Sequence, residues 1–188
     1  MTTPLGPGAF VAVVGASGVG KDSLMDYATE RCDAYSPRRV ITRPAGPGED
    51  HRPVTDAEFD AACARGDFAA HWVAHGLRYG IPVDIDDTVR SGRVAVVNVS
   101  RSVIDELATR YARLVVVRVT VSDDVRERRL RGRGRESGSD VAARLSRPDP
   151  APHRPGDVVI VNDGSVAEGG EQLVRVLRTL GAKSVSRL

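Results

Sequence analysis

The sequence is short of several residue types, and each shortage excludes a class of protein. Aromatic residues make up only 4% of the 188 residues, which argues against the stacking surfaces that bind single-stranded nucleic acid. A net charge of +2 is too small for a chain that neutralises a nucleic-acid backbone, so we expect no nucleic-acid partner. The two cysteines, Cys32 and Cys63, lack metal-ligand spacing, and we expect reduced core thiols in a reducing compartment. No apolar run approaches the ~18 residues of a membrane span, and the N-terminus has no signal-type stretch, so we expect a cytoplasmic protein without a membrane partner.

Lysine is almost absent, and one of the two lysines lies in a glycine-rich segment. The chain has 27 lysine and arginine residues, of which only Lys21 and Lys183 are lysine. The segment around Lys21 matches the phosphate-binding pattern GxxxxGK in full, between an apolar strand and a helical pattern. Glycines let backbone N–H groups wrap around phosphate, and the lysine then reaches the β- and γ-phosphates. We therefore expect Lys21 to be catalytic and ATP to bind along the segment, at Gly15, Ala16, Ser17, Gly18, Val19, Gly20, Lys21, Asp22 and Ser23.

The residue after the lysine departs from this pattern. The pattern has a serine or threonine there as the Mg²⁺ ligand, whereas this chain has Asp22 followed by Ser23. A carboxylate oxygen is a suitable hard ligand for Mg²⁺, but it adds negative charge beside the phosphates. We expect Asp22 or Ser23 to bind Mg²⁺, and an acid to have been lost elsewhere in the site.

Strand-like and helical patterns alternate along the chain. Apolar runs predict strands at 9–14, 38–42, 94–98, 114–119 and 157–161. Helical patterns follow at 23–31, after a capping box at Thr55 and Glu58 that ends at Gly66, and after a second box at Ser165 and Glu168 that ends at Gly181. This alternation predicts a single α/β domain over 1–188, a three-layer sandwich around a mainly parallel sheet, with ligands at the carboxyl ends of the strands. Residues 38–80 and the arginine-rich 126–147 do not fit the layers, and we expect both to be mobile.

The chain resembles the guanylate kinase group of P-loop kinases over nearly its whole length. The resemblance rests on ASGVGK at 16–21, ITR at 41–43, Glu49, RYG at 78–80, RRLRGRGRE at 128–136, Arg144 and VIVNDG at 159–164. It implies that Arg43 and Tyr79 bind the acceptor, with Glu49 nearby, and that Asn162 lies near adenine. It also implies an arginine-rich lid whose Arg129, Arg133 and Arg144 clamp the transferred phosphoryl group. The alternatives are that the arginine run is a solvated helix face and that Tyr79 and Asn162 are structural.

The chain departs from guanylate kinases where they recognise guanine. Gly46 occupies the place of a second phosphate-binding arginine, and Asp50-His51 follows Glu49 where a tyrosine is expected. His71 precedes Trp72 where the group has a glutamate. A neutral imidazole cannot accept the two hydrogen bonds that a carboxylate takes from guanine. The phosphate-binding residues therefore remain while the base-reading groups are missing.

A further substitution follows the middle strand. The acidic motif of the group is replaced by Asn98-Val99-Ser100-Arg101. We interpret this as a carboxylate relocated from the strand to Asp22, with Asn98, Ser100 and Arg101 on the acceptor side. The combination of GKDS, ITR, NVSR, RGRE and VNDGS resembles the ribose 1,5-bisphosphate phosphokinase branch, which uses ATP to phosphorylate the anomeric phosphate of its sugar. This resemblance implies a small sugar phosphate as substrate, and 5-phosphoribosyl 1-diphosphate and ADP as products.

Three other functions compete with this interpretation. A divergent guanylate kinase would use GMP as the acceptor. A catalytically silent kinase-like scaffold is disfavoured because Lys21 and the lid arginines are present. Binding of nucleic acid through the arginine run is the weakest of the three. The sequence leaves open whether the protein is a monomer or a homodimer.

Overall fold

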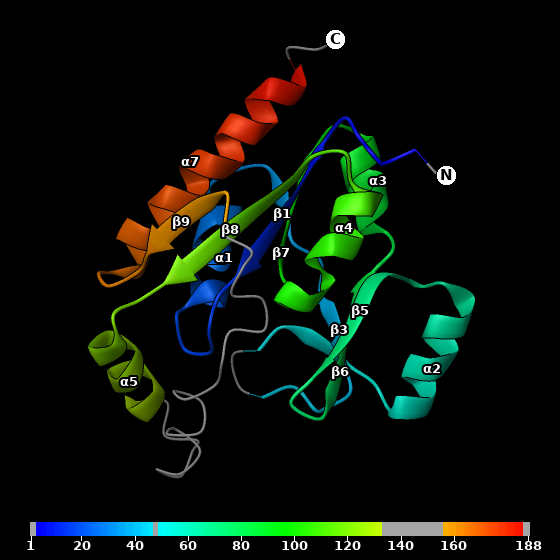
Figure 1. Ribbon diagram of the computed structural model, residues 1–188, viewed down its shortest axis with the longest axis horizontal. Coiled ribbons are helices and arrows are strands. Elements are labelled where there is room, and N and C mark those ends of the chain that lie inside the picture. Colours follow the sequence, from blue (N-terminus) through cyan, green and yellow to red (C-terminus); the bar gives the residue numbers. More distant parts are fainter. Residues whose placement is uncertain (1–2, 47–48, 133–155, 186–188) are drawn as a thin grey trace.

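The computed structural model describes residues 3–46, 49–132 and 156–185. Its centre is a five-stranded sheet in the order β2-β7-β1-β8-β9, in which every neighbouring pair is parallel (Figure 1). The strands are β1 (Ala9–Val14), β2 (Ala34–Tyr35), β7 (Val94–Asn98), β8 (Leu114–Thr120) and β9 (Val158–Val161). The predicted α/β fold with a mainly parallel sheet is confirmed.

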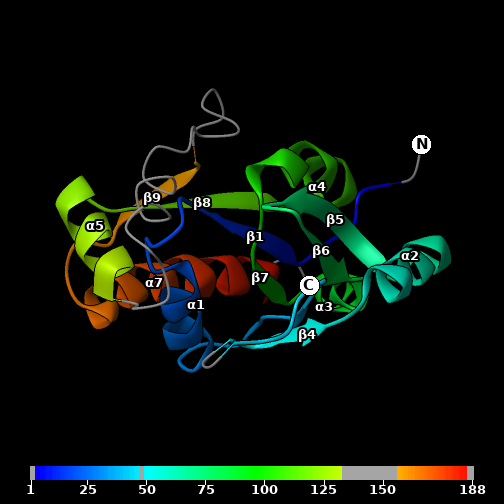
Figure 2. The same ribbon diagram turned by 90° about the horizontal axis from the view of Figure 1, so that it is seen from below.

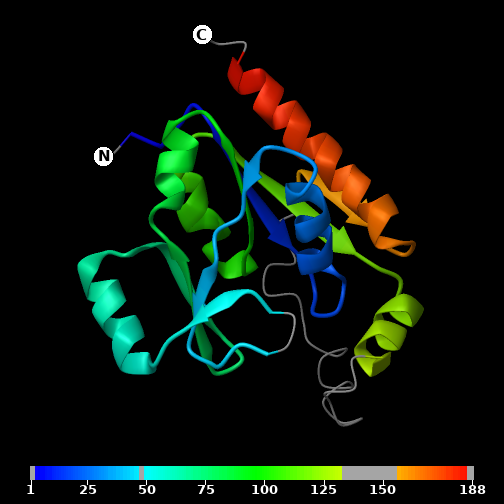
Figure 3. The same ribbon diagram turned by 180° about the vertical axis from the view of Figure 1, so that it is seen from behind.

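Helices cover both faces of this sheet because its central strands are apolar on both sides. Strand β1 is buried at every position. On one face α1 (Lys21–Thr29) and α7 (Val166–Val185) pack beside each other, through Leu24 and Leu177 among others (Figure 3). On the other face lie α3 (Ile85–Arg90), the short 3₁₀ turn η1 (Arg101–Val103) and α4 (Ile104–Arg110), with Leu107 against Phe10 (Figure 2). Helix α5 (Asp123–Gly132) follows β8.

The segment that does not fit the layers is a second, smaller sheet. It has four strands in the order β4-β3-β6-β5, namely β3 (Arg39–Ile41), β4 (His51–Pro53), β5 (Phe68–Ala74) and β6 (Leu77–Pro82). Helix α2 (Asp56–Arg65) lies between β4 and β5 and has the predicted capping box, in which Thr55 and Glu58 satisfy each other's backbone N–H groups. The mobility predicted for this segment and for 126–147 stays a prediction.

Two local predictions were wrong. Helix α7 does not end at Gly181 but continues to Val185. A glycine inside a helix costs about 1 kcal/mol relative to alanine, and the packing of α7 on the sheet outweighs this. The two cysteine thiols are free as expected, but both Cys32 and Cys63 are half-buried instead of fully buried, with Cys32 packed against the core. None of the helices in the described ranges is long and apolar enough to cross a membrane.

Candidate active site

A large cavity opens where the parallel strands of the main sheet end. Its volume is about 1040 Å³, and its walls come from both sheets. Strands β1, β7 and β8 deliver their following loops to the same edge, since parallel strands end at one edge of a sheet. The cavity is lined by the whole of 15–22 and by the residues that the sequence placed on the acceptor side, namely Arg43, Glu49, Tyr79, Asn98, Ser100 and Arg101. The structure thus brings the two predicted groups of residues together.

The phosphate-binding loop joins β1 to α1 in a conformation that requires glycine. Gly20 is the N-cap of α1 and has φ 91°, in the left-handed region. A Cβ atom at Gly20 would lie 2.6 Å from Nδ2 of Asn162, so a larger residue is excluded by space as well as by backbone angle. The loop therefore presents the N-terminus of a nine-residue helix to the cavity, where backbone N–H groups and the helix dipole favour an anion.

The side chain of Lys21 folds back over this loop. Its Nζ donates to the carbonyl oxygens of Gly15 at 2.9 Å and Ala16 at 3.0 Å. The ammonium group is thereby placed on the cavity wall, as phosphate binding requires. Lysine acts on phosphate as a compact point charge, so the position of Nζ matters more than its hydrogen-bond geometry.

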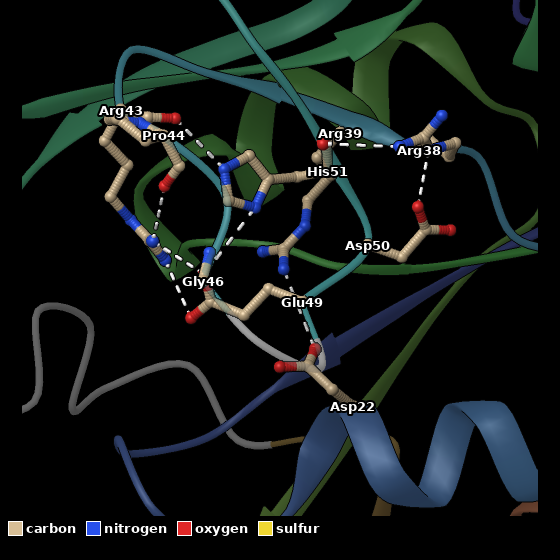
Figure 4. A network of polar contacts seen from close by, with 9 residues as sticks. All are labelled: Asp22, Arg38, Arg39, Arg43, Pro44, Gly46, Glu49, Asp50 and His51. Carbon is tan, nitrogen blue, oxygen red and sulfur yellow. Dashed lines mark hydrogen bonds and ion pairs between the residues drawn. The ribbon is translucent and has the colours of Figure 1, made fainter. Parts of the chain in front are cut away.

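Asp22 contacts two residues across the cavity. Its Oδ1 accepts a 2.8 Å hydrogen bond from Nδ2 of Asn98 at the end of β7. The same oxygen lies 3.7 Å from Nη2 of Arg39 in β3 (Figure 4). The carboxylate is 70% exposed and lies in the first turn of α1, so it faces the cavity beside the phosphate-binding loop. The predicted pair of exchanged residues, Asp22 and Asn98, is therefore in direct contact.

Arg43 is held by Glu49 on the opposite wall. The guanidinium Nη1 and Nη2 atoms donate to the two carboxylate oxygens at 2.6 and 3.0 Å (Figure 4). The Gly46 N–H donates to the same carboxylate at 3.0 Å. The Arg43 hydrogen bonds, with help from Gly46, lower the pKa of Glu49 to about 2. Glu49 is therefore ionised across the ordinary pH range, and its geometry fixes the direction of the Arg43 side chain.

Buried His51 supports the Arg43 backbone from behind. Its side chain is 4% exposed, and its Nε2–H donates to the carbonyl oxygen of Arg43 at 3.2 Å. Its Nδ1 lies 3.9 Å from the Glu49 carboxylate. The loop that carries the acceptor-side arginine is thus tied down by both its main chain and its side chain.

The core-side wall carries a second group of cations and an aromatic pair. Arg101 and Arg118 both line the cavity, and burial together with the charge of Arg118 lowers the pKa of Arg101. On the other side the rings of Trp72 and Tyr79 stack with centroids 5.4 Å apart and planes 3° apart. His71, which precedes Trp72, is exposed and packs near Phe59, not into the cavity.

Some predicted site residues lie away from the cavity wall. Asn162 is 2% exposed, and its Nδ2 donates to the carbonyl oxygen of Val19 at 2.8 Å, behind the loop. Arg129 donates to the same oxygen at 3.4 Å and to the Gly164 carbonyl at 3.2 Å. Ser23 is exposed on α1 and is not among the described residues that line the cavity.

The two remaining lid arginines cannot be placed. Arg133 and Arg144 lie outside the described residues. The predicted roles of Asn162 near adenine and of the lid arginines stay predictions.

Sequence reasoning missed two cavity cations, Arg39 and Arg118. Both lie in strands, at positions whose importance depends on which face of the strand they occupy. For Arg39 a signal was present: it is four residues before Arg43, and alternate residues of a strand point to the same side. For Arg118 the signal was the single charge in the apolar run of β8.

Curated relatives cover nearly the whole chain. The sequence is 65% identical over 179 residues to ribose 1,5-bisphosphate phosphokinase PhnN of Pseudofrankia inefficax, covering 94% of each chain. It is 46% identical over 178 residues to the protein of the same name from Bradyrhizobium diazoefficiens, covering 93% and 90% of the two chains. The protein of that name from Brucella melitensis is 40% identical over 185 residues, covering 95% and 96%.

Solved structures support the fold. A guanylate kinase from Anaplasma phagocytophilum aligns with a TM-score of 0.65 at 22% identity, covering 92% of this chain and 85% of that one. A gluconokinase from Sinorhizobium meliloti aligns with a TM-score of 0.52 at 19% identity, covering 97% and 98%. No family model matches the chain.

Proposed function

Because the chain belongs to the ribose 1,5-bisphosphate phosphokinase family, we propose that it transfers a phosphoryl group from ATP to the anomeric phosphate of ribose 1,5-bisphosphate. The products are 5-phosphoribosyl 1-diphosphate and ADP. An oxygen of the acceptor phosphate forms a bond to the γ-phosphorus of ATP, and the bond from that phosphorus to ADP breaks. The observation that carries the proposal is one cavity that contains a complete phosphate-binding loop and facing arginines.

The predicted site residues divide between the two substrates. The loop 15–23 and Lys21 hold the phosphates of ATP. On the acceptor side Arg43 binds the sugar phosphate in the orientation that Glu49 sets, and Tyr79 continues that wall. Asn98, Ser100 and Arg101 complete the acceptor side from the end of β7. Arg129, Arg133 and Arg144 are assigned to the transferred phosphoryl group.

The chemistry requires cations more than it requires a base. The nucleophile is an oxygen of a phosphate group that is already ionised, so no proton has to be removed from it. The obstacle is the repulsion between two anions, and catalysis of phosphoryl transfer consists mainly of positioning and charge stabilisation. A cavity lined by Lys21, Arg43 and Arg101 is suited to this task.

We propose Asp22 as a protein ligand for Mg²⁺. When bound, Mg²⁺ neutralises charge on the β- and γ-phosphates. The site fits, because the Oδ2 atom of Asp22 has no protein contact among the described residues and the carboxylate faces the cavity. Mg²⁺ is usually bound by one or two carboxylates together with oxygens of the substrate phosphates. The described residues hold no cluster of three or more His, Cys, Asp or Glu side chains. Ser23 has weaker support, since it does not line the cavity. Asp22→Ser should raise the Mg²⁺ concentration that gives half-maximal rate, and an unchanged Mg²⁺ titration would remove Asp22 from this role.

The proposed activity is tested with a panel of acceptors under MgATP, with ADP release as the readout. Ribose 1,5-bisphosphate should be turned over, and GMP should give no more than background. Lys21→Ala should abolish all turnover, and thermal unfolding should show that the variant is still folded. Turnover of GMP without turnover of ribose 1,5-bisphosphate would overturn the proposal. ATP binding without turnover of any acceptor would favour the silent scaffold.

We propose a cytoplasmic location, because the two cysteines are free thiols and free thiols are typical of a reducing compartment.

A further inference from the structure

Arg39 is a positively charged residue of the cavity wall that the sequence motifs did not identify. It is the first residue of β3, and with Ile41 and Arg43 it occupies alternate positions along the chain. All three line the cavity, as expected for side chains on one face of a strand. The neighbouring Arg38 points elsewhere and pairs with exposed Asp50 (Figure 4). The same short segment therefore supplies two arginines to the cavity and one to the surface.

The guanidinium group of Arg39 lies between the two halves of the site. Its Nη1 donates to the carbonyl oxygen of Asn98 at 3.3 Å, and its Nη2 lies 3.7 Å from Oδ1 of Asp22. Strand β3 belongs to the smaller sheet, whereas Asp22 in α1 and Asn98 at the end of β7 belong to the part of the fold built on the main sheet. The side chain is only 21% exposed, so it crosses from one wall toward the other instead of extending into solvent.

The contacts of Arg39 leave donors available. Among the described residues it makes one hydrogen bond and one ion pair that is longer than a hydrogen bond. A guanidinium group has a fork of N–H donors suited to bidentate phosphate binding, and most of that fork is unused here. Arg43, by contrast, is held in a bidentate pair with Glu49. Arg39 is therefore the acceptor-wall arginine with more capacity for a new anion.

We propose that Arg39 binds the reacting phosphate of the acceptor, at the junction where that phosphate meets the γ-phosphate of ATP. This inference rests on the proposed function. The acceptor phosphate enters beside Asp22, and Arg39 contacts it while remaining close to the carboxylate. A cation at this point reduces the repulsion between the two substrates where it is greatest.

A simpler role for Arg39 would be that of a counter-ion. In that role Arg39 only offsets the charge of Asp22 and keeps the carboxylate in place, without touching the acceptor. The two roles differ in how Arg39 and Asp22 depend on each other. If Arg39 acts only through Asp22, then its removal has no effect once Asp22 is replaced. If Arg39 contacts the acceptor, then its removal still weakens acceptor binding when Asp22 has been replaced.

The test is a double-mutant cycle of Arg39→Gln, Asp22→Ser and the double variant. The readout is the Kd for ribose 1,5-bisphosphate measured by calorimetry without nucleotide, which does not require turnover. Arg39→Gln should raise this Kd roughly 10- to 100-fold, the usual effect of losing charge-assisted hydrogen bonds. An increase of at least about 10-fold should persist in the Asp22→Ser background, where Arg39 has lost its partner carboxylate. Arg39→Lys should lie between, because it keeps the charge but not the planar fork.

Arg38→Gln is the matched control, since it removes an arginine from the next position whose own side chain does not line the cavity. It should leave the Kd unchanged, and the KM for ATP should change less than about twofold in Arg39→Gln. The inference would be overturned if Arg39→Gln left the Kd unchanged. It would also be overturned if Arg39→Gln raised the Kd in the wild-type background but not in the Asp22→Ser background. If Arg39→Gln does not fold, the same cycle with Arg39→Lys decides. A wild-type chain that phosphorylates a different phosphorylated acceptor would overturn the proposed function alone, and the cycle would then test Arg39 with that acceptor.

Discussion

Replacement of Glu49 by glutamine tests whether Glu49 orients Arg43 for the acceptor. The carboxylate accepts from both Nη atoms of Arg43 and from the Gly46 N–H, so it holds a side chain and a loop together. Nη1 of Arg43 also donates to the Pro44 carbonyl oxygen at 3.2 Å. The Nε–H of Arg43 has no partner among the described residues and remains for a phosphate. Glu49 therefore orients Arg43 for the acceptor and does not block it.

The size of the expected rise in the acceptor KM follows from the exposure and charge of the two side chains. Glutamine is neutral and has one acceptor oxygen, so it cannot reproduce the bidentate pair. Hydrogen bonds to charged groups contribute about 1.5–3 kcal/mol when buried, but these side chains are 30% and 35% exposed. Solvent screening reduces the loss to about 1–2 kcal/mol. Since 1.4 kcal/mol corresponds to a factor of ten, the KM for the acceptor should rise about 5- to 30-fold.

The KM for the acceptor is measured by steady-state kinetics, in which the concentration of ribose 1,5-bisphosphate is varied at saturating MgATP. The KM for ATP should not change, because the hydrogen bonds of Glu49 to Arg43 and Gly46 lie on the acceptor side. Glu58→Gln is the control: it makes the same chemical change in the exposed capping box of α2, away from the cavity. A lower acceptor KM in Glu49→Gln would refute the reasoning, because Glu49 would then compete with the acceptor for Arg43.

The same pair gives a pH dependence of stability. The folded-state pKa of Glu49, about 2, lies below its ordinary value of 4.5. Its contribution to the free energy of unfolding is therefore full above pH 4.5 and is lost as the pH falls toward 2. Urea unfolding of wild type and Glu49→Gln should differ most at neutral pH, and the difference should shrink as the pH is lowered below 4.5. A difference that stays constant down to strongly acid pH would contradict the assigned pKa.

Two further substitutions distinguish effects on the phosphate-binding loop from effects on stability alone. Asn162→Ala removes the 2.8 Å hydrogen bond to the Val19 carbonyl, and should raise the KM for ATP and lower stability by about 1–3 kcal/mol, measured by kinetics and urea unfolding. An unchanged KM for ATP would mean that the loop holds its shape without Asn162. Asp86→Asn breaks a buried network in which Arg110 and the Tyr111 hydroxyl donate to Asp86, the latter at 2.7 Å, and should cost about 3 kcal/mol in the same unfolding assay. Its kcat/KM should stay unchanged below the melting temperature, because Asp86 does not line the cavity, and a large loss would show that the two regions are coupled.

The main sheet could be predicted because its signals are local. Strands β1, β7 and β8 are continuous apolar runs, and both capping boxes form within four residues of sequence. The hairpin of β5 and β6 was missed because its turn is unusual. His75 and Gly76 have φ values of 57° and 71°, as a two-residue hairpin turn requires. Asparagine or aspartate commonly precedes the glycine in such turns, whereas histidine gives no comparable signal.

In the candidate site, too, the features with local signals could be predicted and the others could not. The phosphate-binding loop could be found because nine consecutive residues contain its chemistry. The contacts of Arg39 and Asn162 could not be predicted, because their partners are distant in sequence: Asn162 contacts Val19 from 143 residues away, and Arg39 contacts Asn98 from 59 residues away. Such pairs are determined by the order of strands in the sheet, which local patterns do not specify.

The contact between Asp22 and Asn98 gives a physical reason for a neutral amide at position 98. The Nδ2 atom of Asn98 lies 2.8 Å from Oδ1 of Asp22. An aspartate at position 98 would place a second carboxylate at that distance, and the two negative charges would repel each other. The amide of Asn98 instead donates a hydrogen bond to the Asp22 carboxylate. A neutral residue at the end of β7 therefore suits a single carboxylate at this place on α1.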